Sequence, residues 1–503
     1  MFSGKKMFFS FLVVVFLVIM AGTSFAEKDT LIVANAFDAK TLDPILTYDL
    51  ASSNVKMAVY DRLVVWDEKT GGVKPGLAEK WEQLDSTNYK FYLRKGVKFH
   101  NGETLKASDV KFSLERALGP QGGSVYAFLS SIKTVEVLDD YTFVIKLKAP
   151  YTPMLTALSI TPGSIVNEKA VKEAGDSYGM NPVGTGAFKF VSWNKGDKIT
   201  LVRFDDYWGE KPKFKNLIIR TVVEPVARVV ELETGAVDIA YYIKPIDMNR
   251  VIENPNLTLL RKTDFSTHYC GFNFLRPPLD NPKVREAIWA ALNTAAMQKA
   301  IDRGVGSLPT SQFPPNQKYF DPSLKPHVQD VEKAKRLLKE AGVENLKLEY
   351  WTDEDYARLA TATMVQAQLE EVGITVEMKV FEWGAFMEGL KQKKQDLYSM
   401  SWTCPPDPDF SLAPVLHSKM IGGTNRSNVN DPELDAMIDK GAQMPDGPER
   451  EALYHKIQDR IVNVLRPWMY VNNGELLVGT QKNVKGFEIS PIGYHSVNGV
   501  YFE

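Results

Sequence analysis

Hydrophobic and polar residues alternate between Asn88 and Leu93 and then change to helical spacing before Leu118. The alternation, with apolar residues at Tyr89, Phe91 and Leu93, predicts a half-buried strand. Gly96 and Asn101-Gly102 supply turn residues after it. Val110, Leu114 and Ala117 then recur at helical spacing, and Ser108 and Asp109 are suitable acceptors for the unpaired N–H groups of a helix start. The pattern predicts a globular α/β protein.

A second stretch, from 345 to 402, alternates strand and helix patterns in regular order. Strands are expected over 346–351, 374–381 and 396–402, and helices over 356–372 and 382–392. This alternation builds a parallel sheet. Ligands of open α/β sheets bind beyond the carboxyl ends of the strands, which is where Trp383 and Trp402 fall. Both tryptophans are therefore candidates for ligand contact, with ordinary core packing as the alternative.

Further helices have marked ends. Asp330 is a suitable cap for a helix that Gly342 stops. Asp431-Pro432-Glu433 opens another helix with a capping acid and a proline in the first turn, and 448–465 continues as the next. We find neither an internal repeat nor a low-complexity segment.

Residues 1–26 have the layout of a secretory signal peptide. Lys5 and Lys6 precede an apolar run, and Thr23 to Ala26 provide small residues for cleavage after Ala26. The run is shorter than the roughly 18 residues expected of a membrane-spanning helix. No Cys lies at the cleavage position, so the lipid-anchoring box is missing. We expect a freely diffusing periplasmic protein; a retained N-terminal anchor is the alternative.

The composition sets the size of the core and the class of partner. The mature chain of about 477 residues carries 58 basic and 62 acidic residues, and 44% of the full chain is hydrophobic. This length exceeds the usual single domain, so two or more lobes are expected. Pairs of basic residues such as Lys393-Lys394 are typical of solvent-exposed surfaces. The sequence has no basic patch dense enough to bind the phosphate backbone of a nucleic acid.

The chain has two cysteines and six scattered histidines. Cys270 and Cys404 could form a disulfide in an oxidising compartment, or remain two small buried thiols. The histidines show no metal-ligand spacing, so neither a metal site nor a cofactor is expected.

The amino-acid sequences of several segments resemble motifs of a known protein family. LRKGVKFHNGE from Leu93 and ASDVKFSLERA from Ala107 are similar to the signature of the dipeptide/oligopeptide/nickel-binding proteins of ABC importers, the extracellular solute-binding protein family 5. Further boxes follow in the family's order over nearly the whole mature chain: TLDP from Thr41, VVWD from Val64, KPGLAEKW from Lys74, NPVGTGAF from Asn181, GFN from Gly271, PPLD from Pro277, VREA from Val284, FEW from Phe381 and SW from Ser401.

The resemblance implies an α/β two-lobed clamp of the periplasmic-binding-protein class II type, with mixed sheets flanked by helices. Lobe I would hold 27–265 plus 480–503, with an inserted subdomain at about 70–180, and lobe II would hold 266–479. The crossings between lobes would lie near 263–269 and 470–479. Such clamps close around a ligand that touches both faces.

Positions that match ligand-lining residues of the family form the candidate site. Lobe II would contribute Trp383 and Trp402, followed by Thr403, Cys404 and Asp407, and the first crossing would contribute His268 and Tyr269. Lobe I would contribute the loop Phe37-Asp38-Ala39, and also Tyr126 and Tyr241. For the two tyrosines of lobe I, surface filling is the alternative, and for Tyr269 it is packing at the hinge.

Departures from the family pattern bear on the substrate. Peptide-binding relatives carry an Asp three residues after the second tryptophan that pairs with the ligand's α-ammonium group, but Pro405 stands here. Asp407 could replace it only along another loop path. The positions that match carboxylate-binding arginines hold Leu390 and Ser399, with Lys391 as the nearest cation. An uncompensated buried ammonium would cost several kcal/mol, which casts doubt on the standard peptide mode.

These observations predict a periplasmic receptor that captures a peptide or peptide-like solute and delivers it to an ABC permease and its ATPases, as a monomer. The alternatives are a receptor for a metal chelate or another non-peptide solute, and a chaperone-like clamp. An enzyme is not expected, because no G-x-S-x-G, H-E-x-x-H or P-loop motif occurs.

Overall fold

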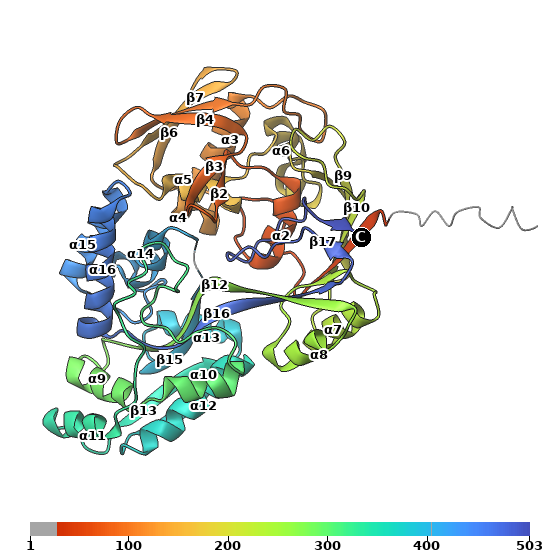
Figure 1. Ribbon diagram of the computed structural model, residues 1–503. Coiled ribbons are helices and arrows are strands. Elements are labelled where there is room, and N and C mark those ends of the chain that lie inside the picture. Colours follow the sequence, from red (N-terminus) through yellow and green to blue (C-terminus); the bar gives the residue numbers. More distant parts are fainter. Residues whose placement is uncertain (1–27, 404) are drawn as a thin grey trace, which may run out of the picture.

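A ten-stranded mixed sheet runs through the molecule and organises the fold (Figure 1). The computed structural model describes residues 28–403 and 405–503. The strand order is β14-β13-β15-β12-β16-β11-β1-β10-β9-β8, so segments from both ends of the chain meet in one sheet. The α/β architecture expected from the sequence is confirmed, whereas the continuity of the sheet was not predicted.

One half of the sheet is built by early segments of the chain. Its strands are β1 (Thr30–Asn35), β8 (Phe188–Asn194), β9 (Lys198–Arg203), β10 (Asn216–Thr221) and β11 (Ile239–Ala240). Strand β1 pairs in parallel with β10 and β11, and β8 and β9 continue as an antiparallel hairpin. Helices α2 (Leu50–Val59), α7 (Pro225–Glu233) and α8 (Met248–Ile252) belong to this half.

The other half confirms the strand–helix alternation predicted for 345–402. Its elements are β13 (Lys347–Asp353), α12 (Tyr356–Glu370), β14 (Thr375–Phe381), α13 (Trp383–Lys391) and β15 (Leu397–Thr403). Strand β13 lies between β14 and β15 and pairs with both in parallel. The carboxyl ends of these strands therefore face the same edge, and Trp383 and Trp402 lie there as predicted.

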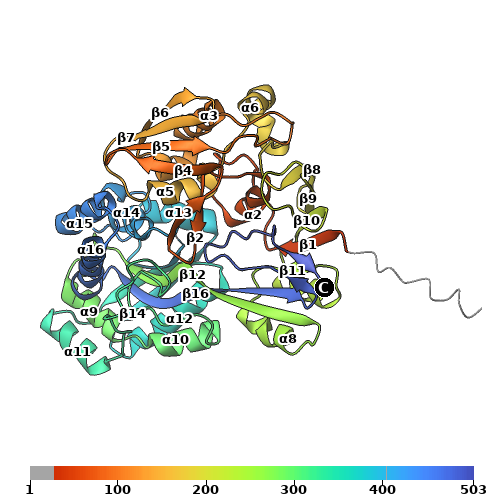
Figure 2. The ribbon, with the colours of Figure 1, turned by 45° about the horizontal axis from the view of Figure 1, so that its top comes forward.

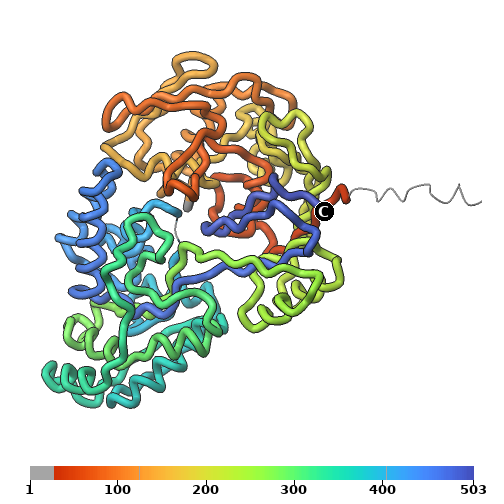
Figure 3. The backbone as a smooth tube through the Cα atoms, in the orientation of Figure 1, coloured from red at the N-terminus to blue at the C-terminus, as the bar shows by residue number. Residues whose placement is uncertain are grey.

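Two long strands connect the halves. β12 (Leu257–Phe272) and β16 (Trp468–Gln481) run antiparallel from Leu257 opposite Gln481 to Gly271 opposite Trp468. Figure 3 shows the two segments side by side across the middle of the molecule. Their ladder is irregular between Thr263 and Thr267, and the predicted crossings fall within these strands. The lobe boundaries themselves remain a prediction.

A separate four-stranded antiparallel sheet covers one side of this framework (Figure 2). Its strands are β4 (Ala78–Gln83), β5 (Asn88–Leu93), β6 (Ile132–Asp139) and β7 (Thr142–Leu147), with α3 (Ala107–Leu118) packed near β6. The predicted strand and helix around 88–118 are confirmed. The helix begins one position earlier than Ser108, because Lys106 is the cap residue and its N–H is bonded by Asp109 at 3.0 Å.

The remaining elements are short or peripheral. The helices are α4 (Tyr126–Leu129), α5 (Met154–Ser159), α6 (Glu168–Ala174), α9 (Pro282–Ala290), α10 (Thr294–Asp302), α11 (Val331–Glu340), α14 (Ala413–Leu416), α15 (Pro432–Gln443) and α16 (Pro448–Asp459), which a π-helical turn at Arg460–Leu465 extends. The strands are β2 (Val64–Asp67), β3 (Gly72–Pro75), β17 (Val484–Lys485) and β18 (Tyr501–Phe502). Asp330 and Asp431 cap α11 and α15, as predicted.

Candidate functional site

Trp402 lies where two hydrophobic cores meet. It is half-buried at the end of β15 and packs against the core around β13–β15 and also against the core of the four-stranded sheet. Its indole Nε1 donates to the carbonyl oxygen of Phe410 at 3.0 Å, which fixes the ring. Trp402 therefore sits at the boundary between the parts of the molecule, where a ligand held between them would lie.

Trp383 stands at the start of α13, directly after β14, with 47% of its surface exposed. The guanidinium carbon of Arg358 lies 5.2 Å from its ring centre, a cation–π distance. Arg358 is held in place by Asp353, whose two oxygens accept from Nε and Nη2 at 2.5 and 2.7 Å. Among the described residues, no partner binds Nη1 of Arg358. A flat aromatic face and a fixed donor thus stand side by side at the sheet edge.

His268, on β12, lies in the same charged neighbourhood. Burial is the main reason that the pKa of His268 is lowered to about 4. Asp355 raises this pKa, whereas the positive charges of Arg358 and Lys244 lower it. The imidazole is therefore neutral at pH 7. Lys244 follows β11, in the other half of the sheet, so groups from both halves surround this histidine. The neighbouring carboxylate of Asp355 already accepts hydrogen bonds from the N–H groups of Ala357 and Arg358, and it thereby caps α12.

The structure does not bring Tyr269 and Tyr241 to this surface. Tyr269 is 2% exposed and stacks on Trp468 at 4.2 Å between ring centres, inside the core of the second half. Tyr241 is buried against Phe487 and His495 in the core of the first half. For Tyr269 the packing alternative describes the geometry, whereas Tyr241 is neither on the ligand surface nor at the molecular surface but in a core.

The three residues of the loop 37–39 differ in exposure and in their contacts. Phe37 is 65% exposed, whereas Ala39 is buried. Asp38 accepts hydrogen bonds from Trp193 Nε1 at 3.0 Å and from the Gly196 N–H at 2.7 Å, so its carboxylate anchors the β8–β9 hairpin. Of this loop, only Phe37 offers a free face to a ligand. Tyr126, at the start of α4, is 42% exposed and has the same freedom.

Asp407 is committed to the protein interior. The fully buried guanidinium of Arg450 contacts both of its oxygens, the nearest at 3.1 Å, and the Asp409 N–H donates to it at 3.0 Å. These bonds leave no free carboxylate for a ligand ammonium, so the idea that Asp407 replaces the missing acid finds no support in this geometry. Thr403, the last residue of β15, is exposed. Cys404 lies outside the described residues, as does the question of its pairing with Cys270.

Contacts between the four-stranded sheet's subdomain and the second half form a seam. Tyr151 Oη donates to Asp409 Oδ2 at 3.0 Å, and Thr152 N donates to the Ala442 carbonyl at 2.8 Å. Phe128 and Phe410 meet at 5.5 Å between ring centres. A cavity of about 380 Å³ opens along the seam between Tyr151, Asp407 and Asp446. The two parts of the molecule are thus in direct contact in this structure.

Sequence reasoning missed Arg358, although the signal was available. The strand-end rule that selected both tryptophans also selects the first turn of α12, which follows the carboxyl end of β13. No cluster of three or more metal-ligating side chains occurs within 28–403 and 405–503. Within the same ranges, none of the helices has the length and apolar character needed to cross a membrane.

A two-part α/β molecule with aromatic and charged side chains between its parts is a ligand-capturing clamp. The family model for bacterial extracellular solute-binding proteins, family 5 Middle, matches residues 72–423. The chain therefore belongs to family 5 of the bacterial extracellular solute-binding proteins, as its motifs indicated. This family consists of periplasmic solute-binding proteins, so the prediction that the chain is not an enzyme is confirmed.

Relatives cover almost the whole chain. The dipeptide-binding protein of Escherichia coli K12 is 29% identical, over 97% of this chain and 97% of the relative. The ABC transporter-associated periplasmic binding protein DppA from Helicobacter pylori, in complex with the peptide STSA, is 30% identical with a TM-score of 0.83, covering 95% of this chain and 98% of that one. The PBP AgaA from A. tumefaciens R10, in complex with agropinic acid, is 29% identical with a TM-score of 0.81, covering 94% and 99%.

Proposed function

We propose that this protein is the periplasmic receptor of an ABC importer, which captures a small solute between two lobes and presents it to a membrane permease driven by ATPases. Lobe I would hold 27–265 and 480–503 with its subdomain at about 70–180, and lobe II would hold 266–479. The observation that carries the proposal is the placement of Trp402, Trp383 and Arg358 at one sheet edge between the two parts. The protein would act as a monomer after removal of residues 1–26.

The ligand surface we propose combines aromatic faces with one fixed cation. Trp383 and Trp402 would cover the solute from lobe II, and Phe37 and Tyr126 would approach it from lobe I. Arg358 is rigid before the ligand arrives, because Asp353 binds two of its nitrogens. Preorganisation of this kind reduces the entropy lost on binding.

The charges favour a solute with an acceptor group, such as a carboxylate, over one anchored by an α-ammonium group. Pro405 stands at the position of the family's ammonium partner, and Asp407 is paired with Arg450. Arg358 and Lys244 both supply positive charge near His268. We therefore propose a peptide-like acid as the substrate. The Helicobacter pylori protein in complex with the peptide STSA and the A. tumefaciens protein in complex with agropinic acid support this range of chemistry.

A metal chelate remains the alternative solute, since a chelator supplies its own metal ligands. A chaperone-like clamp is the alternative from another class, and its ligands would be long and chemically varied. One-to-one saturable binding of a small solute would exclude the clamp.

A thermal-shift screen of the mature protein tests the proposal. The panel contains free-amine dipeptides, N-acetylated dipeptides, glutathione, opine-like acids, sugars and nickel chelates. A ligand at about 100 times its Kd stabilises by roughly 2.7 kcal/mol, which moves the melting temperature measurably. Stabilisation by N-blocked acids and opine-like acids supports the proposed class. Stabilisation by free-amine peptides alone would overturn it, and stabilisation by chelates alone would favour the alternative.

Arg358→Gln and Lys299→Gln are the matched variants for any hit. Arg358→Gln removes the proposed anchor, whereas Lys299 is an exposed residue of α10 that forms no ion pair with the residues of the proposed ligand surface. The hit should bind Arg358→Gln at least tenfold more weakly and bind Lys299→Gln like the wild type. Equal affinities for both variants would place the ligand elsewhere.

A further inference from the structure

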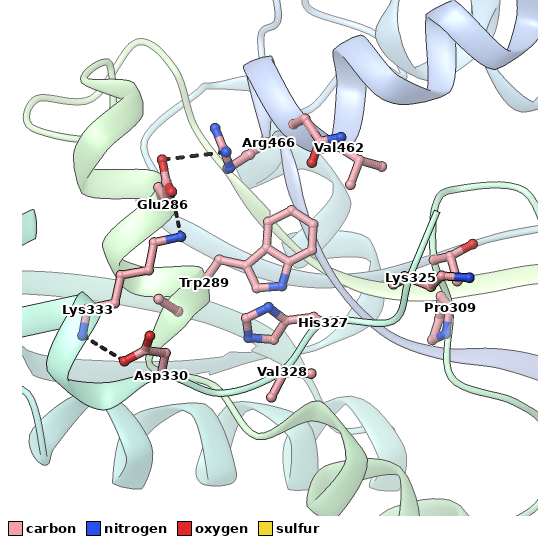
Figure 4. Close-up of a pocket in the computed structure, with 13 residues that line it drawn as sticks. Glu286, Trp289, Pro309, Lys325, His327, Val328, Asp330, Lys333, Val462 and Arg466 are labelled. Carbon is pink, nitrogen blue, oxygen red and sulfur yellow. Dashed lines mark hydrogen bonds and ion pairs between the residues drawn. The ribbon is translucent and has the colours of Figure 1, made fainter. Parts of the chain in front are cut away.

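A pocket outside the interlobe surface has the features of a second binding site. It lies between α9, the start of α11, the loop around Pro309 and the π-helical turn that ends before Arg466, and its volume is about 270 Å³ (Figure 4). Figure 1 places α9 and α11 in the half that holds β13 and β15, at the opposite end of the molecule from the four-stranded sheet. Nothing in the proposed capture of solute between the lobes uses this pocket.

The pocket wall holds polar groups without partners. Trp289 is 8% exposed, and its indole Nε1 has no hydrogen-bond partner in the part of the chain that the structure describes. The hydroxyl of Thr310 is also buried without a partner. A buried donor that finds no acceptor costs about 1–3 kcal/mol, so such groups are rarely left unpaired. An acceptor atom of a ligand that enters the pocket would satisfy them.

Positive charge exceeds negative charge around the pocket. Lys325, Lys333 and Arg466 line it, against Glu286 and Asp330. Glu286 is shared, because Lys333 contacts it at 2.8 Å and Arg466 at 3.5 Å. Asp330 accepts from the N–H of Lys333 and so caps α11. Both acids are therefore engaged, and Lys325 has no partner among the described residues.

A further cation behind the wall adds to this field. The guanidinium of Arg285 is bonded only to the carbonyl oxygens of Leu465, Leu279 and Asp280, without a carboxylate. Burial, together with the neighbouring Arg466, lowers the pKa of Arg285 to about 10. An anion near Arg466 would relieve this repulsion between like charges.

Apolar surface completes the pocket. The Trp289 ring lies 5.4 Å from the ring of His327 between centres, and Val328 and Val462 extend the same wall. Burial lowers the pKa of His327 to about 4, so this imidazole is neutral and adds no charge at pH 7. A ligand that fits must therefore have a flat or compact apolar body and an anionic acceptor.

We propose that this pocket binds a small organic carboxylate with an apolar body, independently of the solute held between the lobes. The carboxylate lies toward Lys325 and Arg466 and accepts from Thr310, and the apolar body packs on Trp289. Trp289 also meets Tyr470 of β16 edge-on, at 5.8 Å between ring centres. Tyr470 belongs to one of the two crossing strands, so the occupied pocket has a direct contact with the hinge.

Sodium benzoate is the probe, and benzamide is its uncharged counterpart of the same shape. Binding to the mature protein is measured by calorimetry and by methyl NMR of ¹³C-labelled valine. We expect saturable benzoate binding with shifts at Val328 and Val462, at least tenfold weaker binding of benzamide, and a loss of tenfold or more in Arg466→Gln. Lys325→Gln should weaken binding several-fold, while Lys299→Gln, a matched exposed lysine, should bind like the wild type.

Three results would overturn the proposal: no saturable benzoate binding up to about 10 mM, equal affinities for benzoate and benzamide, or shifts confined to other valines. If Arg466→Gln fails to fold, Lys325→Gln decides, because this side chain is exposed and makes no bond within the described residues. The test does not depend on the solute of the interlobe surface, so either proposal can fail without the other.

Discussion

The hydroxyl of Tyr151 donates to Oδ2 of Asp409 at 3.0 Å and thereby ties the subdomain of the four-stranded sheet to the second half of the molecule. The other oxygen of Asp409 is buried and has no hydrogen-bond partner among residues 28–403 and 405–503. Thr152 adds bonds to the carbonyls of Ala442 and Met444 at 2.8 and 2.6 Å. In the proposed division into lobes, these bonds join lobe I to lobe II, so we expect them to contribute only to the closed state.

Removal of the Tyr151 hydroxyl should therefore weaken ligand binding without any contact to ligand. A hydrogen bond of this kind contributes about 1 kcal/mol, so Tyr151→Phe should raise the ligand Kd roughly fivefold. Calorimetric titration of the hit from the screen measures the change. Tyr92→Phe is the matched control, because Tyr92 donates to exposed Glu82 at 3.2 Å on the same small sheet. If both variants bind like the wild type, the Tyr151 contact does not stabilise closure.

The buried carboxyl group of Asp409 also predicts how the stability of the protein depends on pH. Burial and the nearby Asp407 raise the pKa of Asp409 from 3.8 to about 7, while Tyr151 and Arg450 lower it and Asp439 raises it. The unfolded chain loses this proton near pH 4, but the folded protein keeps it until about pH 7. The contribution of this group to the free energy of unfolding is therefore greatest below pH 4. It falls by about 4 kcal/mol at most as the pH rises from 4 to 7, and it is constant above pH 7.

Asp409→Asn isolates that effect. The amide cannot ionise, so the free energy of unfolding of this variant should fall less than that of the wild type between pH 4 and pH 7. Urea unfolding at several pH values gives both curves. Buried Asp264, with its pKa raised to about 6, titrates in both proteins and cancels in the difference. Parallel curves would mean that Asp409 is ionised in the folded protein throughout this range.

Much of the fold could be predicted from local patterns. The units from β13 to β15 and from β5 to α3 matched because their hydrophobic periodicity agrees with the final burial. The starts of α11 and α15 matched because Asp330 and Asp431 cap them. The single sheet of ten strands was not predictable in this way. Its continuity rests on the pairing of β12 with β16, whose partner residues are far apart in the chain, from Gly271 opposite Trp468 to Leu257 opposite Gln481.

The site was harder to predict, because side-chain direction is set by tertiary packing. Trp402 and Trp383 follow strand ends and were found by that rule. Tyr269 lies on the crossing strand β12 and Tyr241 directly follows β11, but a strand turns alternate side chains to opposite faces, and these two face the cores. Asp407 matched only by position in a loop, and nothing in the sequence pointed to Arg450 as its partner, 43 residues later.

The Asp407–Arg450 pair should matter for stability. Arg450 is fully buried, and its removal would leave the carboxylate of Asp407 without its counter-ion. Breaking one partner of a buried pair costs about 3–5 kcal/mol. Arg450→Met should lower the free energy of unfolding by that amount, and Arg450→Met with Asp407→Asn should recover part of the loss. Chemical unfolding of the three proteins measures the coupling; a double variant no more stable than Arg450→Met would show that the pair's charges are not the cause.

This pair also separates stability from recognition. Asp407→Asn keeps the shape of the side chain and removes its charge, so it should destabilise the fold and leave the preference among ligands unchanged. A selective loss of free-amine ligands in Asp407→Asn would instead identify Asp407 as an ammonium partner, contrary to its pairing here.

Gly474 makes the irregular crossing of β12 and β16 possible. A Cβ at this position would lie 2.1 Å from Ser266 Oγ and 2.5 Å from Asp264 Oδ1. Those two side chains cannot easily move apart, because Ser266 donates to Asp264 through its N–H at 2.9 Å and through its hydroxyl at 2.6 Å. Gly474→Ala must therefore break this pairing or shift the crossing strands, at a cost of about 1–3 kcal/mol.

We expect Gly474→Ala to lower the free energy of unfolding and to change ligand affinity, because the displaced backbone belongs to both crossing strands' ladder. Gly72→Ala in β3 is the matched control, since its nearest new contact is Thr70 Oγ1 at 3.6 Å, an ordinary van der Waals distance. Unfolding by urea and titration of the ligand give the two readouts. If Gly474→Ala is as stable as Gly72→Ala and binds equally well, then Asp264 and Ser266 yield without cost, and the close approach at Gly474 does not constrain the hinge.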